Sequence, residues 1–356
     1  MQFTFSEDQL LFQTSVRGLL EKECPPESVR ALWDTETGRS PALWAKLADI
    51  GLIGLLAPEH HGGMGLTEID LVLPLEETGR TALPEPVVET AAVGVPLIRE
   101  SGSTALQERW LPAIAAGNAI VTVGHSANPC VTDAHVADLL LLQQGDEVHA
   151  VPRARVRLER QPCLDNSRRL FRVEWTPDGE TRIASGGEGR RLLAAAFDRG
   201  ALATAAQALG IAQQLVDLAA AYAKQREQFG KPIGSFQAIK HMLANVQVRI
   251  EFARPVVCRA AFSVARNTAN QSVAVSHAKA AASEAAVLAA KTALQVHGAV
   301  GYTWEIDLHM WMKRAWALEA AWGTGAAHRA RIGTAVLDGD GPAPSFGFSA
   351  PIGPSP

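Results

Sequence analysis

The chain has 356 residues and a formal net charge of −4, with 47% hydrophobic and 20% charged residues. This composition supports a large apolar core and excludes a disordered chain, and the lack of a strongly basic block argues against a nucleic-acid partner. No apolar run is long enough to span a membrane, the first residues lack the pattern of a signal peptide, and the four cysteines form no C-x-x-C pair. We therefore expect a cytoplasmic protein with no metal site and no disulfide framework.

Residues 1–118 are predicted to form an α-helical domain. Ser6, followed by acidic residues and then by an apolar run from Leu10, is typical of a helix start. Apolar residues at helical spacing between positions 43 and 52 predict another helix, which ends near a glycine-rich turn that begins at His60. A third helix is expected from about Thr67.

Residues 119–189 are predicted to form a small β domain. Short apolar or β-rich runs at 120–124, 139–143, 148–151 and 170–175 stand between glycine, proline and aspartate residues. The arginine-rich stretch 153–172 is interleaved with acidic residues. We interpret that stretch as a solvent-exposed strand and turn region.

Residues 190–337 are predicted to form a C-terminal four-helix bundle. Alanine is abundant in this part, and four long helices are expected at 190–226, 235–267, 271–298 and 305–336. Pro255 lies inside the second helix and should kink it. Residues 338–356 are rich in glycine and proline and are predicted to be a flexible tail. The fold class is therefore mainly α with a small β domain.

The order of a helical domain, a β domain and a helix bundle resembles the architecture of acyl-CoA dehydrogenases. The segment W-A-K-L-A-D-I-G-L-I-G-L-L-A-P-E-H-H-G-G-M-G, which starts at Trp44, is similar to a family pattern in the N-terminal domain, and E-E-T-G-R follows it at 76–80, as in the family. The resemblance covers about residues 1–337. It implies the acyl-CoA dehydrogenase fold, with a reduced, barrel-like β domain.

Two further segments resemble the family's FAD-binding motifs. R-E-Q-F-G-K-P-I-G-S-F-Q matches R-x-Q-F-G-x-x-I-x-x-F-Q, and Q-V-H-G-A-V-G-Y matches Q-x-x-G-G-x-G-[FY] except for Ala299 in place of the second glycine. The planar fork of arginine suits a pyrophosphate, a phenyl ring suits adenine, and glycines let backbone amides approach phosphate. The resemblance implies that six residues contact the FAD of a neighbouring subunit: Arg226, Gln228, Phe229, Gln295, Gly298 and Gly301.

The sequence departs from the family where the chemistry takes place. In the family, a glutamate removes the α proton of an acyl-CoA thioester, and it lies either before Gly-Thr in the last helix or early in the first bundle helix. The matching positions here are Trp322 and Gly200. An indole cannot accept a proton at neutral pH. The loop that holds the flavin ring in the family, T-E-P-x-x-G-S-D, is also missing from the matching segment after Val123.

These losses fall on one half of an interfacial site, because in the family one subunit provides the flavin loop and the base and the other provides the R-x-Q-F and glycine-loop motifs. The resemblance therefore implies a heteromeric enzyme. A homologous catalytic subunit would supply the base, and this chain would complete its FAD site in an α2β2 tetramer like those of actinobacterial acyl-CoA dehydrogenases of steroid side-chain degradation. The implied substrate is an acyl-CoA, by analogy a steroid side-chain thioester, and the implied electron acceptor is an electron-transfer flavoprotein.

Two alternatives stay open from the sequence. The first is an active homomeric dehydrogenase with a displaced base: Glu319 lies one helical turn before Trp322, and Glu305 and Asp307 are further candidates. The second is a flavin-free scaffold protein that has left catalysis altogether.

Overall fold

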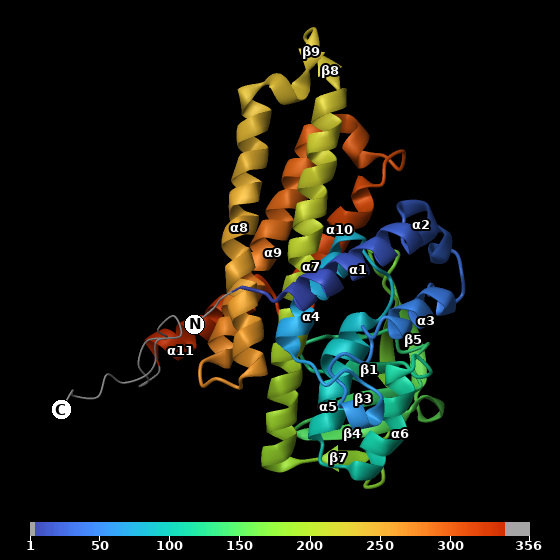
Figure 1. Cartoon of the computed structure of the whole chain (residues 1–356). Helices are drawn as coiled ribbons and strands as arrows, with labels where there is room; N and C mark the ends of the chain where they lie inside the picture. Colours follow the sequence, from blue (N-terminus) through green and yellow to red (C-terminus); the bar gives the residue numbers. More distant parts are fainter. Residues whose placement is uncertain (1–3, 339–356) are drawn as a thin grey trace, which may run out of the picture.

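The computed structural model describes residues 4–338. Figure 1 shows a bundle of long helices with the N-terminal helices and the β-rich part packed against one side. No helix within residues 4–338 is long and apolar enough to cross a membrane. The same part of the chain contains no cluster of His, Cys, Asp and Glu side chains that could hold a metal ion.

The N-terminal part is helical, as the sequence predicts. The helix start at Ser6 is confirmed: Gln9 N–H donates to Ser6 Oγ over 3.2 Å and Ser6 N–H donates to Gln9 Oε1 over 2.8 Å, which together make a capping box. The helix expected from Thr67 is also confirmed, with Thr67 as its N-cap. The elements are α1 (Glu7–Glu23), α2 (Pro26–Trp33), α3 (Pro41–Asp49), the 3-10 turn η1 (Glu59–His61), α4 (Glu68–Arg80), the π-helix η2 (Val88–Gly94), α5 (Val95–Glu100) and α6 (Thr104–Ala115).

Seven strands form the β-rich part. They are β1 (Val121–Gly124), β2 (Val131–Thr132), β3 (Leu139–Gln144), β4 (Glu147–Pro152), β5 (Arg157–Gln161), β6 (Leu170–Glu174) and β7 (Arg182–Ala184), with the 3-10 turn η3 (Arg153–Arg155) between β4 and β5. One sheet has the order β1-β3-β4-β7 and the other has the order β2-β6-β5; β1 and β3 are parallel, whereas the remaining pairs are antiparallel. The four predicted strands are confirmed, β5 lies in the stretch 153–172 that we interpret as a solvent-exposed strand and turn region, and β2 and β7 are additional.

The bundle contains α7 (Gly186–Gln225), α8 (Gln237–Ala265), α9 (Gln271–His297), α10 (Leu308–Ala320) and α11 (Gly325–Leu337). Between α7 and α8 lie the short hairpin β8 (Glu227–Gln228) and β9 (Lys231–Pro232) and the 3-10 turn η4 (Ile233–Ser235), and η5 (Gly298–Tyr302) follows α9. Helix α8 continues through Pro255. The tail predicted at 338–356 lies outside the described residues apart from Asp338.

The prediction of one helix over 305–336 is wrong, because the segment 321–324 separates α10 from α11. Trp322 and Gly323 have φ values of 56° and 92°. Two consecutive residues with positive φ cannot continue a right-handed helix. The alanine-rich pattern on both sides of this turn concealed it in the sequence.

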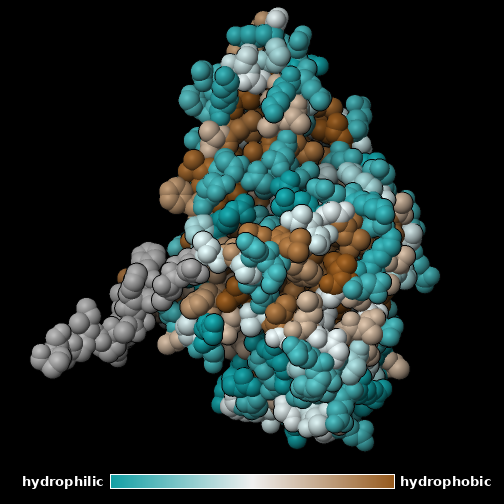
Figure 2. All heavy atoms as spheres, viewed as in Figure 1, coloured by the Kyte–Doolittle hydropathy of each residue, from teal (hydrophilic) through white to brown (hydrophobic). Residues whose placement is uncertain are grey.

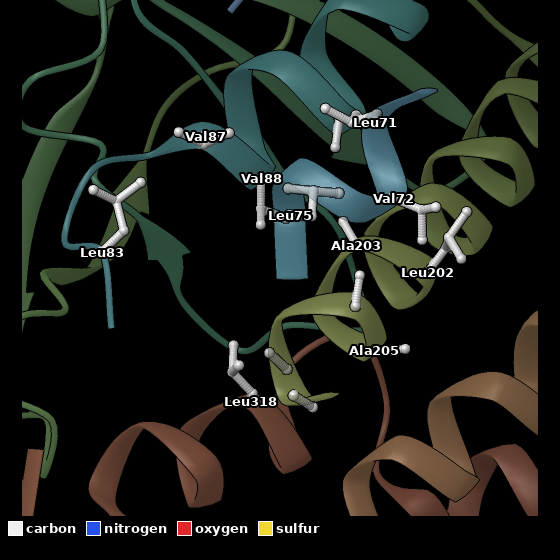
Figure 3. Packing of buried hydrophobic residues seen from close by; sticks show 14 of the residues in the cluster. Leu71, Val72, Leu75, Leu83, Val87, Val88, Leu202, Ala203, Ala205 and Leu318 are labelled. Carbon is white, nitrogen blue, oxygen red and sulfur yellow. The ribbon is translucent and has the colours of Figure 1, made fainter. Parts of the chain in front are cut away.

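The helix α7 runs the length of the molecule and passes against α4 (Figure 1). Glycines allow the two backbones to approach closely: a Cβ atom at Gly79 would lie 2.1 Å from the carbonyl oxygen of Gln207, and one at Gly210 would lie 1.9 Å from that of Glu76. Figure 3 shows Leu75 of α4 beside Ala203 of α7, and Val72 beside Leu202. This packing holds α7, which carries Gly200 and leads into the 226–229 motif, in a fixed position against α4.

Candidate functional site

The turn at 321–324 holds the first predicted site residue. Trp322 is only 1% exposed and is the largest fully buried side chain among residues 4–338. The backbone N–H of Trp322 donates to Asn128 Oδ1 over 2.8 Å, and its backbone carbonyl accepts a hydrogen bond from His328 Nε2 over 2.9 Å. The unusual backbone conformation of Trp322 is therefore held from two sides, and its indole points into the protein.

Gly200 of α7 lies directly against this indole. A Cβ atom at Gly200 would be 2.2 Å from Trp322 Cδ2 and 2.3 Å from Trp322 Cε2, far closer than non-bonded carbon atoms approach. The two positions at which the sequence analysis looked for a glutamate therefore face the same point in space. The indole fills that point, and only glycine fits opposite it.

His125, in the loop after β1, packs on the same indole. The ring centroids of His125 and Trp322 are 5.5 Å apart, and those of His125 and Phe197 are 5.8 Å apart. Ala127 N–H donates to His125 Nδ1 over 3.0 Å, so the proton of a neutral ring is on Nε2, which donates to the Leu193 carbonyl over 3.2 Å. Burial lowers the pKa of His125, which favours this neutral, fully hydrogen-bonded ring.

His328 of α11 closes the other side of the turn. Its Nε2 donates to the Trp322 carbonyl, its Nδ1 accepts from Ser276 Oγ over 3.1 Å, and its ring stacks on Phe197 with centroids 5.4 Å apart. Burial lowers the pKa of His328 to about 4. With both nitrogens engaged, the ring serves the packing around Trp322 and has no free nitrogen for proton transfer.

The structure places the three alternative carboxylates away from a shared catalytic position. Glu319 Oε1 accepts a hydrogen bond from Gly325 N–H over 3.1 Å, at the start of α11, where a negative charge is favourable. Glu305 is exposed. Asp307 precedes α10 and forms an ion pair with Arg30. Each carboxylate thus has a structural or solvent-facing role in this chain.

A group of buried charged residues lies beside Trp322 and was missed by the sequence analysis. A cavity of about 40 Å³ is lined by Leu318 and Ala321 and by charged side chains of the α2–α3 loop, the α4–η2 loop, η2, the β part and α10. Arg39 forms an ion pair with Asp133, and Arg314 forms an ion pair with Asp165. All four side chains are buried. Burial raises the pKa of Glu85 to about 7 and also raises that of Glu89.

This cavity has room for a few water molecules, not for an acyl chain. Ion pairs and hydrogen bonds hold its walls: Arg168 Nη2 donates to Thr132 Oγ1 over 3.3 Å, and Ser40 N–H donates to Glu85 Oε1 over 2.8 Å. The signal in the sequence was the pair of glutamates around P-V-V at 86–88. It was easy to miss, because the partners of such residues come from distant parts of the chain.

The predicted cofactor-binding motif at 226–229 forms the tip of a hairpin at one end of the bundle, opposite the β-sheets (Figure 1). Gln228 pairs with Lys231, so Phe229 and Gly230 are the two central residues of the turn, with φ values of 56° and 77°. Positive φ at both positions is the mark of a type I′ turn, which is strained for a phenylalanine. Arg226 and Gln228 are exposed, and Phe229 is 92% exposed.

The second motif lies near the C-terminal end of α9. Gln295 and Gly298 are exposed, and Gly301 packs under Leu294, where a Cβ atom would lie 2.9 Å from Leu294 Cδ1. Tyr222 of α7 stacks on His297 of α9 with ring centroids 4.3 Å apart. This contact brings the ends of α7 and α9 together, so that both motifs lie at the same end of the bundle.

The two halves of the candidate site therefore differ in chemical capability. Around Trp322 the volume is filled by aromatic rings, and the polar atoms of His125 and His328 have internal partners, so the residues present do not fit a flavin ring or a thioester. The end of the bundle presents an exposed guanidinium, amide and phenyl ring. Guanidinium groups bind phosphate oxygens through paired hydrogen bonds, and a phenyl ring offers a flat face for an aromatic base.

Comparison with known proteins identifies the class. The family model described as the N-terminal domain of acyl-CoA dehydrogenases matches residues 6–118, and the model described as their C-terminal domain matches residues 187–337. "Acyl-CoA dehydrogenase IpdE2" of Mycolicibacterium smegmatis is 34% identical over 317 residues, which cover 87% of this chain and 93% of the relative. The chain belongs to the acyl-CoA dehydrogenase family, and the predicted fold class is confirmed.

Solved structures of similar fold include heteromeric assemblies. The ChsE4-ChsE5 complex from Mycobacterium tuberculosis matches with a TM-score of 0.85 and 26% identity, over 96% of this chain and 100% of the matched chain. A variant of the Tcur3481-Tcur3483 steroid ACAD matches with a TM-score of 0.85 and 26% identity, over 94% of this chain and 98% of the matched chain.

Proposed function

We propose that this chain is the non-catalytic subunit of a heteromeric, FAD-dependent acyl-CoA dehydrogenase. A homologous partner subunit supplies the catalytic base and the flavin-ring loop in an α2β2 tetramer in the cytoplasm. The chain completes the partner's FAD site with the hairpin residues Arg226, Gln228 and Phe229 and with Gln295, Gly298 and Gly301.

The contact between Gly200 and Trp322 is the observation that carries this proposal. A Cβ atom at Gly200 would lie 2.2 Å from the indole, so position 200 cannot present a carboxylate while Trp322 is in place, and position 322 itself carries an indole instead of a carboxylate. The indole also occupies the volume that such a carboxylate and a thioester would share. The chain's own pocket is thus unsuited to removing an α proton.

The hairpin supports the other half of the proposal. A phenylalanine that is 92% exposed, in a strained left-handed conformation, contributes little to the stability of its own chain. Such a residue is expected where it contacts another molecule. Arg226 is exposed nearby and free to bind phosphate oxygens with both arms of its guanidinium.

Bound FAD supplies the electron sink for α,β-desaturation, while the protein supplies the base and the geometry. The relatives whose names refer to steroid dehydrogenases and to two-chain complexes favour a steroid side-chain CoA thioester as the substrate. They also favour a partner of the same family. An electron-transfer flavoprotein is the proposed acceptor.

The test is to express the chain alone and together with its candidate catalytic partner, and to measure FAD by absorbance and subunit ratio by native mass spectrometry. We expect two FAD per α2β2 tetramer, dehydrogenase activity only in the coexpressed sample, and no flavin in the chain alone. Arg226→Ala should lower the FAD content of the complex, whereas Lys224→Ala, at an exposed position two residues before Arg226, should not.

A yellow, active homotetramer from this chain alone would refute the proposal and would support the displaced-base alternative. A complex from the native host that contains no flavin would also refute the proposal, and it would support the alternative of a flavin-free scaffold protein.

A further inference from the structure

A second cleft lies between the C-terminal end of α2 and the loop that joins β5 to β6. Its volume is about 530 Å³, within the range of small-molecule sites. The indole of Trp33 forms one wall, and residues 160–169 form much of the rest. None of the six predicted cofactor residues lines it.

Three arginines, Arg160, Arg168 and Arg169, and one carboxylate, Asp34, line this cleft. Arg168 also lines the small cavity near Ala321, and its guanidinium donates to Thr132 and Ala317 there. Arg160 and Arg169 are therefore the guanidinium groups available to the cleft. Within residues 4–338, none of these four charged side chains forms an ion pair, whereas Arg39, Arg199, Arg314 and Arg331 are each paired with a carboxylate. A net positive cleft is unusual on a chain whose formal charge is −4.

The positive charge is only partly compensated by hydrogen bonds. Arg169 is 3% exposed and donates to the carbonyls of Asn166 and Trp33 over 2.6 and 2.7 Å. Burial, together with the nearby charge of Arg160, lowers the pKa of Arg169. The bonds from Arg168 to Ala317 and Thr132 are long, at 3.4 and 3.3 Å. An anion in the cleft would relieve this repulsion.

The walls of the cleft are held in place without a ligand. Trp33 Nε1 donates to Ser167 Oγ over 2.7 Å, and the buried Arg39 donates to the Ser167 carbonyl over 2.9 Å. Gly38 has a φ of 66°, and a Cβ atom there would lie 2.8 Å from the guanidinium of Arg169. A glycine is thus needed for this arginine to reach its position, and the arrangement is preorganised.

We propose that this cleft binds a small organic oxyanion, with its phosphate or carboxylate group on Arg160 and Arg169 and a planar group against Trp33. Guanidinium groups bind both oxyanions through paired hydrogen bonds. The inference is independent of the proposed function, because the cleft shares no residue with the hairpin motif or with the Trp322 turn.

The experiment is calorimetric titration of the full chain at low ionic strength. The probes are inorganic phosphate, phenyl phosphate and benzoate. We expect phenyl phosphate to bind more tightly than inorganic phosphate because its ring can pack on Trp33. A comparison of phenyl phosphate with benzoate then distinguishes phosphate from carboxylate as the preferred group. Affinity should fall as salt is raised.

Arg160→Gln should weaken binding at least about tenfold, as expected when a charged hydrogen-bond donor is lost. Arg160→Lys should have an intermediate effect because the charge stays and the planar fork is lost. Arg157→Gln is the matched control: Arg157 is on the same strand, its side chain is 86% exposed, and it is paired with Glu174 rather than directed to the cleft. Thermal unfolding of each variant checks that it is folded.

The proposal is overturned if none of the three probes binds at millimolar concentration. It is also overturned if Arg157→Gln weakens binding as much as Arg160→Gln does, because the binding would then be a general surface effect. In either case the FAD content of the complex is expected to be unchanged, which keeps this result separate from the test of the proposed function.

Discussion

The α-carbon of Gly200 faces the indole of Trp322 so closely that a Cβ atom at position 200 would lie 2.2 Å from the ring. The Gly200→Ala variant should therefore be destabilised by about 1–3 kcal/mol, the usual cost of overpacking a core. Urea unfolding followed by circular dichroism would measure it. Gly333→Ala is the control, because Gly333 has open space around its Cα in α11; alanine there should add up to about 1 kcal/mol. An unchanged Gly200→Ala variant would contradict the described packing.

Replacing Trp322 by glutamate should not create an active enzyme. The Trp322→Glu chain would bury a carboxylate among His125, Phe197 and His328 in place of an indole that is 1% exposed. We expect a loss of more than about 3 kcal/mol of unfolding free energy and no dehydrogenase activity from the chain alone. Trp316→Glu, at a site that is 37% exposed on α10, should be far milder. Activity in the Trp322→Glu chain would show that the pocket is intact.

The Phe229→Asn substitution separates stability from cofactor binding. It produces an Asn-Gly turn, the sequence that type I′ hairpins prefer, and it removes strain of roughly 1–2 kcal/mol from the left-handed phenylalanine. The chain should thus be as stable or more stable in thermal unfolding. The complex should nevertheless retain less FAD, because the phenyl ring is lost. Equal FAD content in the variant and the parent would remove Phe229 from the proposed site.

Glu319→Gln should leave the activity of the complex unchanged. The carboxylate accepts a hydrogen bond from Gly325 N–H at the start of α11, and a glutamine oxygen can still accept it. The charge–dipole interaction, which amounts to about 0.3–1 kcal/mol, is lost together with the attraction between the Glu319 carboxylate and the buried ammonium group of Lys279. Steady-state kinetics and thermal unfolding of the variant would check both statements. Loss of turnover with retained FAD would revive Glu319 as a displaced base.

His328 should make the stability of the chain depend on pH. Burial lowers the pKa of His328 to about 4 from an ordinary value of 6.5, so the unfolded chain takes up a proton in a pH range where the folded chain does not. The contribution of His328 is therefore complete above pH 6.5 and is lost progressively as the pH falls towards 4.

The measurement is urea unfolding at several pH values for the parent and for His328→Gln. The variant should be less stable at neutral pH, and its stability should fall less on acidification. Glu85, whose pKa is raised to about 7 by burial, contributes a slope of the opposite sign, but it does so in both proteins and cancels in the comparison. Parallel pH profiles would mean that His328 is already protonated or solvated in the folded chain.

Local patterns in the sequence were enough to predict most of the secondary structure. The leucine run at 139–142 and the capping signal at Ser6 each lie in the expected element. The exposed strand β5 was anticipated within 153–172, but its bounds were not, because its sequence R-L-E-R-Q shows no apolar alternation. Such a strand is stabilised by its ladder to β6, which a local pattern does not reveal.

The arrangement around the candidate site depends on contacts between distant residues. Gly200 and Trp322 could each be identified from a motif, but their mutual contact required the fold. The same holds for the buried pair of Arg39 and Asp133, which are 94 positions apart. Charged residues in loops are usually solvated, so neither would be expected in the interior without its partner.

The length of α7 has a consequence for how such a protein can arise. Gly200 and the end of the helix at Gln225 belong to one continuous element, so the filled pocket and the hairpin are separated by roughly 38 Å of helix at 1.5 Å per residue. Substitutions at one end are too far away to disturb the other. If the proposed function is correct, one of two duplicated genes could lose the catalytic residues of its own product. That product would still complete the FAD site of the protein encoded by the other gene. Selection would then preserve the two genes as an obligatory pair.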